Sequence, residues 1–143
     1  MTPQQIALVQ DSFRKVMPIA DTAAAMFYAR LFELDPSLRQ LFKGELRKQG
    51  MMLMSMIGSA VRGLTDPNAL VPVLHALGRR HAGYGVEDAH YTTVAAALLW
   101  TLERGLGNAF TPAAEQAWTR VYGLLAATMQ QGAAEAAMMQ AAE

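Results

Sequence analysis

The sequence of 143 residues contains no cysteine, and this absence removes several kinds of chemistry at once. Without a thiol, the chain cannot form disulfides, iron–sulfur clusters, zinc–thiolate sites or a cysteine nucleophile. An excess of charge of one sign is also missing, since 12 Lys and Arg residues balance 12 Asp and Glu residues. No run of basic residues stands out, so nucleic acid is not expected as a partner.

Long hydrophobic runs are absent as well. The longest, MMLMSMIGSAV and VAAALLWTL, fall short of the roughly 20 apolar residues that a helix needs to cross a bilayer. The first residues, MTPQQIALVQDSF, lack the charged and then apolar pattern of a signal peptide. The sequence therefore predicts no membrane span and a cytoplasmic location.

Strand signals are sparse, and the remaining pattern is helical. Apolar residues recur every three or four positions, whereas β-branched residues are few and scattered. Thr2, Asp35, Asp66 and Thr111 each precede a proline, and each is expected to cap a helix because its side-chain oxygen can accept a free backbone N–H. Helices are predicted near residues 3–17, 19–34, 36–41, 45–63, 67–81, 88–106 and 112–131. The predicted fold class is all-α, in a single domain.

The three histidines do not form a local metal site. His75 and His81 are six residues apart, on different sides of one predicted helix, whereas ligand pairs on a helix are three or four residues apart. His90 lies in the next predicted helix, beyond a glycine-containing turn. A metal held only by these histidines is not expected. Haem remains possible because the porphyrin supplies four iron ligands and one histidine completes the site.

His81 suits that single role. Leu74 and Leu77 precede it at helical spacing, and the segment AGYG follows, in which Gly83 and Gly85 can adopt left-handed backbone angles. The residues alone leave a second interpretation open. A histidine in the last turn of a helix interacts favourably with the helix dipole and can serve only as a cap.

Several separated motifs together resemble the bacterial single-domain globins. The segments FYARLF, LRQLF, LGRRHAGYGVEDAHYTTV and AWTRVYGLLA occur in this order within about residues 4–131. The likeness is close to the haem domain of flavohaemoglobins and to the neuroglobin-like globins of extremophilic bacteria. It implies a globin fold, a 3-on-3 helical sandwich around haem b (iron protoporphyrin IX). The globin domain would cover residues 1–132, and the Ala-rich tail 133–143 would extend the last helix or fray.

The resemblance also implies which residues surround the haem. His81 matches the histidine that ligates iron on the proximal side. Tyr28 and Gln49 match distal positions that donate hydrogen bonds to a bound gas, and Leu53 follows Gln49 by one turn on the same helix face. The further expected haem contacts are Phe42, Arg80, Val86, Tyr91, Val94 and Leu98.

Two physical expectations accompany these assignments. The ring N–H of His81 that faces away from iron needs an acceptor, for which a backbone carbonyl near Leu77 is suitable. Two distal donors, each contributing roughly 1 kcal/mol or more, would slow gas release at least tenfold. His90 is expected at the start of the following helix with no role at iron. The methionines of the distal helix are expected to fill core space: Met51, Met52, Met54 and Met56.

The function implied by the resemblance is reversible binding of dioxygen at ferrous iron, with nitric oxide and carbon monoxide as further ligands. The alternatives are an enzyme, either a nitric oxide dioxygenase or a weak peroxidase, and a haem-free helical interaction protein. Turnover is expected to need a separate reductase, because the sequence ends before a flavin module. Ala133 stands where flavohaemoglobins carry a proximal glutamate, which argues against peroxide chemistry. A monomer or a weak homodimer is expected.

Overall fold

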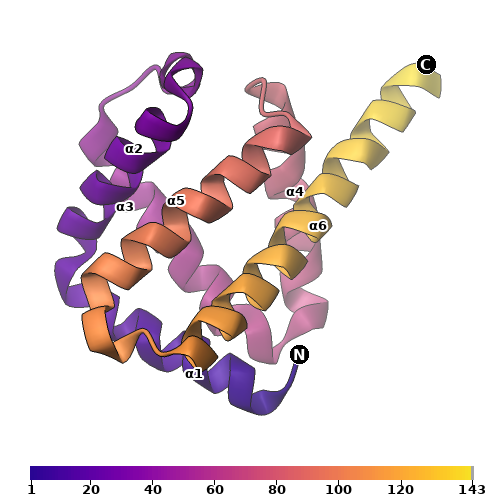
Figure 1. Ribbon diagram of the computed structural model, residues 1–143. Helices are drawn as coiled ribbons and strands as arrows, with labels where there is room; N and C mark the ends of the chain where they lie inside the picture. The colour runs from indigo at the N-terminus through magenta and orange to yellow at the C-terminus, as the bar shows by residue number, and fades with distance from the viewer. Residues whose placement is uncertain (143) are drawn as a thin grey trace.

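Six α-helices and four short 3-10 helices make up the described part of the chain, residues 1–142, in a computed structural model (Figure 1). Side chains are described through residue 139, and Glu143, the end of the predicted tail, lies outside the described residues. In chain order the elements are α1 (Pro3–Val16), η1 (Met17–Ile19), α2 (Ala20–Leu34), η2 (Pro36–Leu41), α3 (Leu46–Arg62), η3 (Gly63–Thr65), α4 (Pro67–Gly83), α5 (Asp88–Leu106), η4 (Gly107–Ala109) and α6 (Pro112–Ala142). Within this range there is no strand, and the all-α prediction is confirmed.

The ends of the helices test the four predicted caps. Three are confirmed by backbone N–H groups that donate to the expected side chains: Gln5 N to Thr2 Oγ1 (3.1 Å), Ser37 N to Asp35 Oδ1 (3.1 Å) and Ala114 N to Thr111 Oγ1 (3.2 Å). The prediction for Asp66 is wrong, because its side chain makes no capping hydrogen bond. Its backbone carbonyl instead accepts from the N–H groups of Ala69 and Leu70, both at 3.2 Å.

The main core lies where α1, α3, α5 and α6 meet. Trp118 of α6 is only 2% exposed, and its indole N–H donates to the hydroxyl of Ser12 on α1 at 2.8 Å. Ser12 in turn donates to the carbonyl of Leu8 at 2.6 Å, so the buried polar groups are satisfied. This network joins α1 to α6 and fixes the position of α6 in the core. Helix α6 in turn packs against α4.

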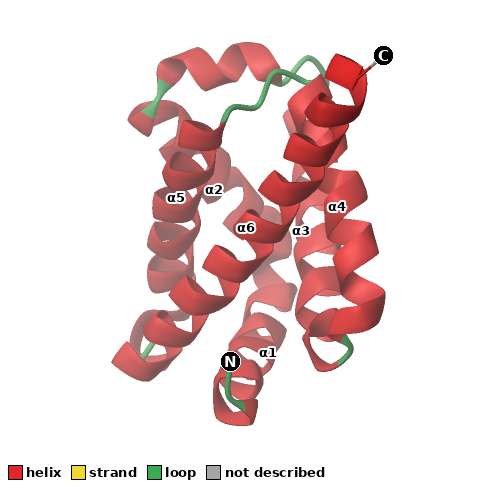
Figure 2. Ribbon diagram, turned by 90° about the vertical axis from the view of Figure 1, so that its right-hand side faces the viewer, coloured by secondary structure: helices red, strands yellow, loops and turns green. Residues whose placement is uncertain are grey.

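Helix α4 lies beside α6 (Figures 1 and 2) and packs on fewer elements than the other α-helices do. It packs extensively on α6 and touches η3, but it makes few backbone contacts with α3 or α5. Helix α3 packs instead on α2 and α1, and α2 packs on α5. The side of α4 that faces away from α6 is thus not closed by another tightly packed helix.

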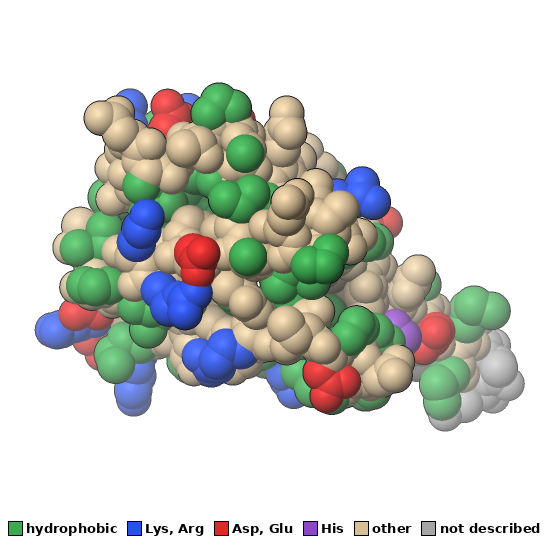
Figure 3. Space-filling model, turned by 90° about the horizontal axis from the view of Figure 1, so that it is seen from below, with side chains coloured by type: hydrophobic (Ala, Val, Ile, Leu, Met, Phe, Trp, Pro, Cys, Tyr) green, Lys and Arg blue, Asp and Glu red, His purple; other side chains and the backbone are tan. Residues whose placement is uncertain are grey.

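The surface is mixed in charge and includes exposed methionines. On the face seen in Figure 3, basic and acidic side chains are interspersed with apolar ones. Met51 and Met52 are each 61% exposed, so the expectation that they fill the core is wrong, whereas Met54 is 8% exposed and does so. Met54 points inward because it lies on the face of α3 that meets α1 and α5. Among the described residues, no helix has the length and apolar character that a bilayer crossing needs.

Candidate functional site

His81 lies in the last turn of α4, where its ring is half-buried and held by its own helix. The ring atom Nδ1 is 2.9 Å from the backbone carbonyl oxygen of Leu77, one turn earlier. Because a carbonyl only accepts, Nδ1 carries the proton in this arrangement and Nε2 keeps a free lone pair. The sequence-based expectation of an acceptor near Leu77 is met, and the ring orientation is set relative to α4.

The environment of His81 favours its neutral form. Burial lowers the pKa of His81, the hydrogen bond to the Leu77 carbonyl acts in the opposite direction, and the positive charge of Arg80 lowers the pKa further. The net shift is downward, so the imidazole is neutral at neutral pH. A neutral imidazole is the form that can bind a metal.

The turn after His81 lies next to η2. The N–H of Val86 donates to the carbonyl of His81 at 3.0 Å, and Gly85 adopts the positive φ of 93° that this turn requires. Gly83 stays within α4 and has no positive φ, so only one of the two predicted glycines has a left-handed conformation. A Cβ atom built on Gly85 would lie 3.6 Å from Leu41 of η2. The proximal turn is therefore close to the segment that carries Phe42.

Tyr28 lies at the centre of a group of aromatic rings between α2, η2 and α3. It is 5% exposed, and its ring forms an edge-on pair with Phe42 at a centroid distance of 5.2 Å and stacks near Phe32 at 6.0 Å. A Cβ on Gly50 would lie 3.7 Å from Cε2 of Tyr28. Tyr28 thus lies against α3 at Gly50, the residue that follows the predicted distal residue Gln49 in the chain.

The chemistry of Tyr28 is that of a hydrogen-bond donor. Burial raises the pKa of Tyr28 to about 12, so the phenol is protonated over the whole neutral range. Its hydroxyl makes no hydrogen bond with any residue that the structure describes, and the O–H is free to donate to a ligand. Gln49 is half-buried one turn before Leu53, in the position from which an amide N–H can serve as a second donor.

A set of apolar residues remains only half-buried beside Tyr28. They lie at the edge of a core cluster formed by Phe27, Tyr28, Leu31, Leu38 and Ala97. This set includes the predicted haem contacts Phe42, Val94 and Leu98 and the predicted distal residue Leu53. Removing apolar side chains from water lowers the free energy, so the partial exposure of these residues marks a surface where an apolar group can bind.

The remaining predicted residues are near the start of α5 or at the surface. The backbone carbonyl of Tyr91 accepts a hydrogen bond from the hydroxyl of Tyr122 on α6 at 2.6 Å. Burial raises the pKa of Tyr91, and the nearby charge of Asp88 adds to this shift.

Arg80 is exposed and forms no ion pair among the described residues. His90 accepts from the backbone N–H of Glu87 at 2.9 Å and caps α5, in agreement with its predicted place.

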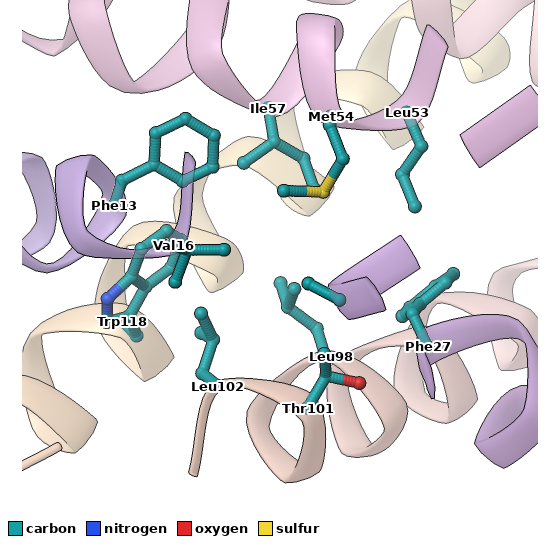
Figure 4. A pocket seen from close by; sticks show the side chains of 11 residues that line it. Phe13, Val16, Phe27, Leu53, Met54, Ile57, Leu98, Thr101, Leu102 and Trp118 are labelled. Carbon is teal, nitrogen blue, oxygen red and sulfur yellow. The ribbon is translucent and has the colours of Figure 1, made fainter. Parts of the chain in front are cut away.

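Two hollows border this region. A small apolar cavity of about 20 Å³ lies between α1, α2, α3, α5 and α6, and Figure 4 shows Leu53, Leu98 and Phe27 pointing toward it. A wider open groove of about 480 Å³ runs between α2 and α3, with the Tyr28 ring in its wall. Asp21 and Arg47 line the groove, with 3.9 Å between Oδ2 and Nη2. Tyr28 is therefore adjacent to open space, although it is almost completely buried.

Sequence reasoning missed one aromatic neighbour of the site. Phe32 stacks near Tyr28, as noted, and also pairs edge-on with Phe42 at 5.6 Å. The available signal was its position four residues after Tyr28, which places both rings on one face of α2. The described residues contain no cluster of three or more His, Cys, Asp or Glu side chains that could hold a metal ion.

The chain is similar to known proteins of one family. The globin family model matches residues 25–129. Neuroglobin of Tetraodon nigroviridis is 33% identical over 121 residues, which cover 75% of this chain and 76% of that protein. A flavohemoprotein of Xylella fastidiosa is 28% identical over 128 residues, which cover 87% of this chain, and the match spans 32% of that longer protein.

Solved structures have the same architecture. An engineered carbene transferase, made from a proposed nitric oxide dioxygenase of Rhodothermus marinus, is 27% identical, with a TM-score of 0.88 and a match that covers 99% of each chain. A hexacoordinated heme protein from a tardigrade is 16% identical, with a TM-score of 0.84 and a match covering 93% of this chain and 95% of that one. At this low identity, the second likeness shows the fold alone. The predicted globin fold is confirmed.

The burial of Tyr28 predicts how stability depends on alkaline pH. Between the ordinary pKa of 10.0 and the raised value of about 12, the folded protein keeps a proton that the unfolded chain has lost. The free energy of unfolding should therefore fall as pH rises above about 10. Tyr28→Phe should remove part of this loss of stability. The part removed should be of the order of 2 kcal/mol at most near pH 12.

Urea unfolding at a series of pH values from about 8 to about 12 measures this dependence. Tyr84→Phe is the matched control, because Tyr84 is 64% exposed, and it should leave the pH profile of stability unchanged. An alkaline profile of Tyr28→Phe identical to that of the wild type would contradict the argument from burial.

Proposed function

Because this chain belongs to the globin family, whose members bind gases at haem, we propose that it holds haem through His81 and binds dioxygen reversibly, with Tyr28 and Gln49 slowing its release. The observation that carries this proposal is the hydrogen bond between Nδ1 of His81 and the Leu77 carbonyl. It leaves Nε2 as a free, neutral ligand atom that is oriented by the helix itself.

The residues present fit a haem group. When bound, haem would supply an iron atom at which a diatomic gas can bind, and His81 would hold that iron. His81 offers a neutral nitrogen, and the half-buried side chains of Phe42, Leu53, Val94 and Leu98 offer an apolar surface that a porphyrin would cover. Since the chain has no cysteine for thioether attachment, the group we propose is haem b, held without a covalent bond to the porphyrin.

The distal residues support slow release of dioxygen. The hydroxyl of Tyr28 is protonated and has no competing partner among the described residues, and the half-buried Gln49 of α3 carries an amide N–H that can serve as a second donor. Hydrogen bonds in a dry, apolar surrounding are stronger than the same bonds in water. Two donors aimed at a bound gas favour holding it over delivering it. We therefore infer oxygen storage or scavenging in the cytoplasm, with nitric oxide and carbon monoxide as competing ligands.

Loss of His81 tests the anchoring of haem. His81→Ala should abolish or strongly weaken haem retention, because it removes the only protein nitrogen that we assign to iron. The visible absorption of purified protein after reconstitution with haemin measures retention. His75→Ala on the same helix is the control and should retain haem. If His81→Ala and wild type held haem equally well, the ligand would have to be another residue.

Loss of Tyr28 tests the distal donor. Tyr28→Phe keeps the ring but removes the O–H, so dioxygen should dissociate about fivefold faster, as expected for one hydrogen bond of roughly 1 kcal/mol. The double variant Tyr28→Phe/Gln49→Val should release dioxygen at least about tenfold faster than the wild type. Stopped-flow displacement of dioxygen by carbon monoxide gives these rates. An unchanged rate in both variants would remove the distal donors from the proposal.

Nitric oxide dioxygenation is the alternative function. It is favoured by the likeness to the proposed dioxygenase from Rhodothermus marinus and to the Xylella flavohemoprotein, of which this chain spans about a third. The proximal side argues for gas binding as the main property. Ala133 occupies the position of the flavohaemoglobin glutamate, and Glu135 lies 3.9 Å from Nδ1 of His75. The electrons for repeated turnover would come from a separate reductase.

Mixing the dioxygen-loaded protein with nitric oxide in a stopped-flow instrument separates the two functions. If the protein is mainly a gas binder, each haem should react with nitric oxide once. Addition of NADH and a flavin reductase should then give no further turnovers. Sustained consumption of nitric oxide with the reductase would instead establish the enzyme. Tyr28→Phe provides the comparison, since faster loss of dioxygen should lower the yield of nitrate in either case.

A further inference from the structure

The position of His81 depends on the position of α4 as a whole. The ring and the carbonyl that orients it, on Leu77, belong to the same helix, so they move together if α4 moves. Helix α4 packs extensively on α6, touches η3, and has few backbone contacts with α3 or α5. The contact with α6 therefore decides where the imidazole of His81 lies relative to the rest of the site.

Two buried glycines form this contact. A Cβ built on Gly78 of α4 would lie 1.9 Å from the backbone oxygen of Met129 on α6. A Cβ built on Gly132 of α6 would lie 2.3 Å from the backbone oxygen of His75 on α4. Each helix thus touches the main chain of the other at a residue that has no side chain. Helices that pack through ordinary side chains keep their axes about 8–10 Å apart, and glycine permits a closer approach.

We propose that Gly78 and Gly132 are positioning residues for the iron ligand: the backbone contact between α4 and α6 sets the depth and angle at which His81 faces the haem. This inference rests on the proposed role of His81. Gly78 and Gly132 are not among the predicted haem contacts. They act on His81 only through the position of α4, the helix that carries it. Gly78 precedes His81 by three residues, so a displacement at the crossing reaches the imidazole within one helical turn.

An alanine at either glycine cannot be absorbed by a local adjustment. Real Cβ atoms essentially never come within 3.0 Å of another heavy atom, so Gly78→Ala requires α4 and α6 to separate by about 1 Å (3.0 minus 1.9). The atom that is met belongs to the backbone of a long helix, and no flexible side chain can rotate away. Helix α4 has no other extensive partner, so it is the element that shifts.

The same two helices provide matched controls. Gly83 of α4 and Gly123 of α6 have no heavy atom within 4 Å of a built Cβ. Gly83 is nearer to His81 in the sequence than Gly78 is, yet an alanine there meets nothing. Alanine is also favoured over glycine within a helix, so Gly83→Ala and Gly123→Ala should stabilise the fold slightly.

The test uses the haem-loaded protein and two readouts. The iron–histidine stretching band of the ferrous, ligand-free form, seen by resonance Raman spectroscopy, reports the geometry of the imidazole at iron. Transfer of haemin to an excess of an acceptor globin reports retention. Gly78→Ala and Gly132→Ala should shift the band and speed transfer by about tenfold, an effect expected of a weakened axial bond. Gly83→Ala and Gly123→Ala should change neither.

A second comparison separates positioning from general damage. In His81→Gly protein supplied with free imidazole, the axial ligand is no longer attached to α4. Adding Gly78→Ala in this background should leave the band where it was, because the crossing acts only through the attached ring. A band shift of equal size with free imidazole would overturn the proposal, since the haem pocket itself would have changed.

The remaining outcomes are also decisive. If Gly78→Ala held haem with the wild-type band, the inference would be wrong, while loss of haem in His81→Ala would still uphold His81 as ligand. If Gly78→Ala failed to fold by circular dichroism, the measurement would be repeated with Gly132→Ala and with Gly78→Ala in the stabilised Gly83→Ala/Gly123→Ala background. Failure of all of them to fold would overturn the proposal, because the glycines would then be required for folding and not for positioning.

Discussion

The close contact between the backbones of α4 and α6 is the constraint on which the arrangement of the site depends. Helix α6 is itself held in the core, where Trp118 donates to Ser12 of the first helix. Helix α6 then contacts α4 at Gly78 and Gly132. The two backbones come so close there that neither position has room for a side chain. By our proposal, this main-chain packing places the iron ligand His81, while α4 makes few backbone contacts with α3.

The two halves of the site are built by different physical means. On the proximal side a single hydrogen bond within α4 orients His81, and burial keeps its ring neutral. On the distal side, packing of the Tyr28, Phe32 and Phe42 rings orients the phenol, and burial keeps the phenol protonated. Burial thus shifts one pKa down and the other up, and in both cases it retains the uncharged form. A neutral imidazole and a neutral phenol fit the roles that we propose for them, as an iron ligand and as a donor to an uncharged diatomic gas.

The helices could be predicted from the sequence because their signals are local. Apolar spacing and the oxygen–proline pairs at Thr2, Asp35 and Thr111 located the elements to within a few residues. Asp66 has the same local pattern, yet its backbone carbonyl, and not its side chain, accepts hydrogen bonds from the N–H groups at the start of α4. The exposure of Met51 and Met52 was also missed, since their hydrophobicity says nothing about which face of α3 meets another helix. The roles of His81, Tyr28, Gln49 and the haem contacts remain predictions, and the structure places Tyr28 against Gly50, the chain neighbour of Gln49.

The sequence by itself determined the all-α class and the order of the helices, and it led to the prediction that His81 holds iron, because helical periodicity and spaced motifs are readable along one chain. Only the tertiary structure decided which helix holds α4, which ring stacks with Tyr28, and which glycines lie against the backbone of another helix. Gly78, Gly83, Gly123 and Gly132 all occur within helices and have similar local surroundings in the sequence. Two of them meet the backbone of another helix and two meet nothing, and this difference arises from contacts between residues about fifty positions apart.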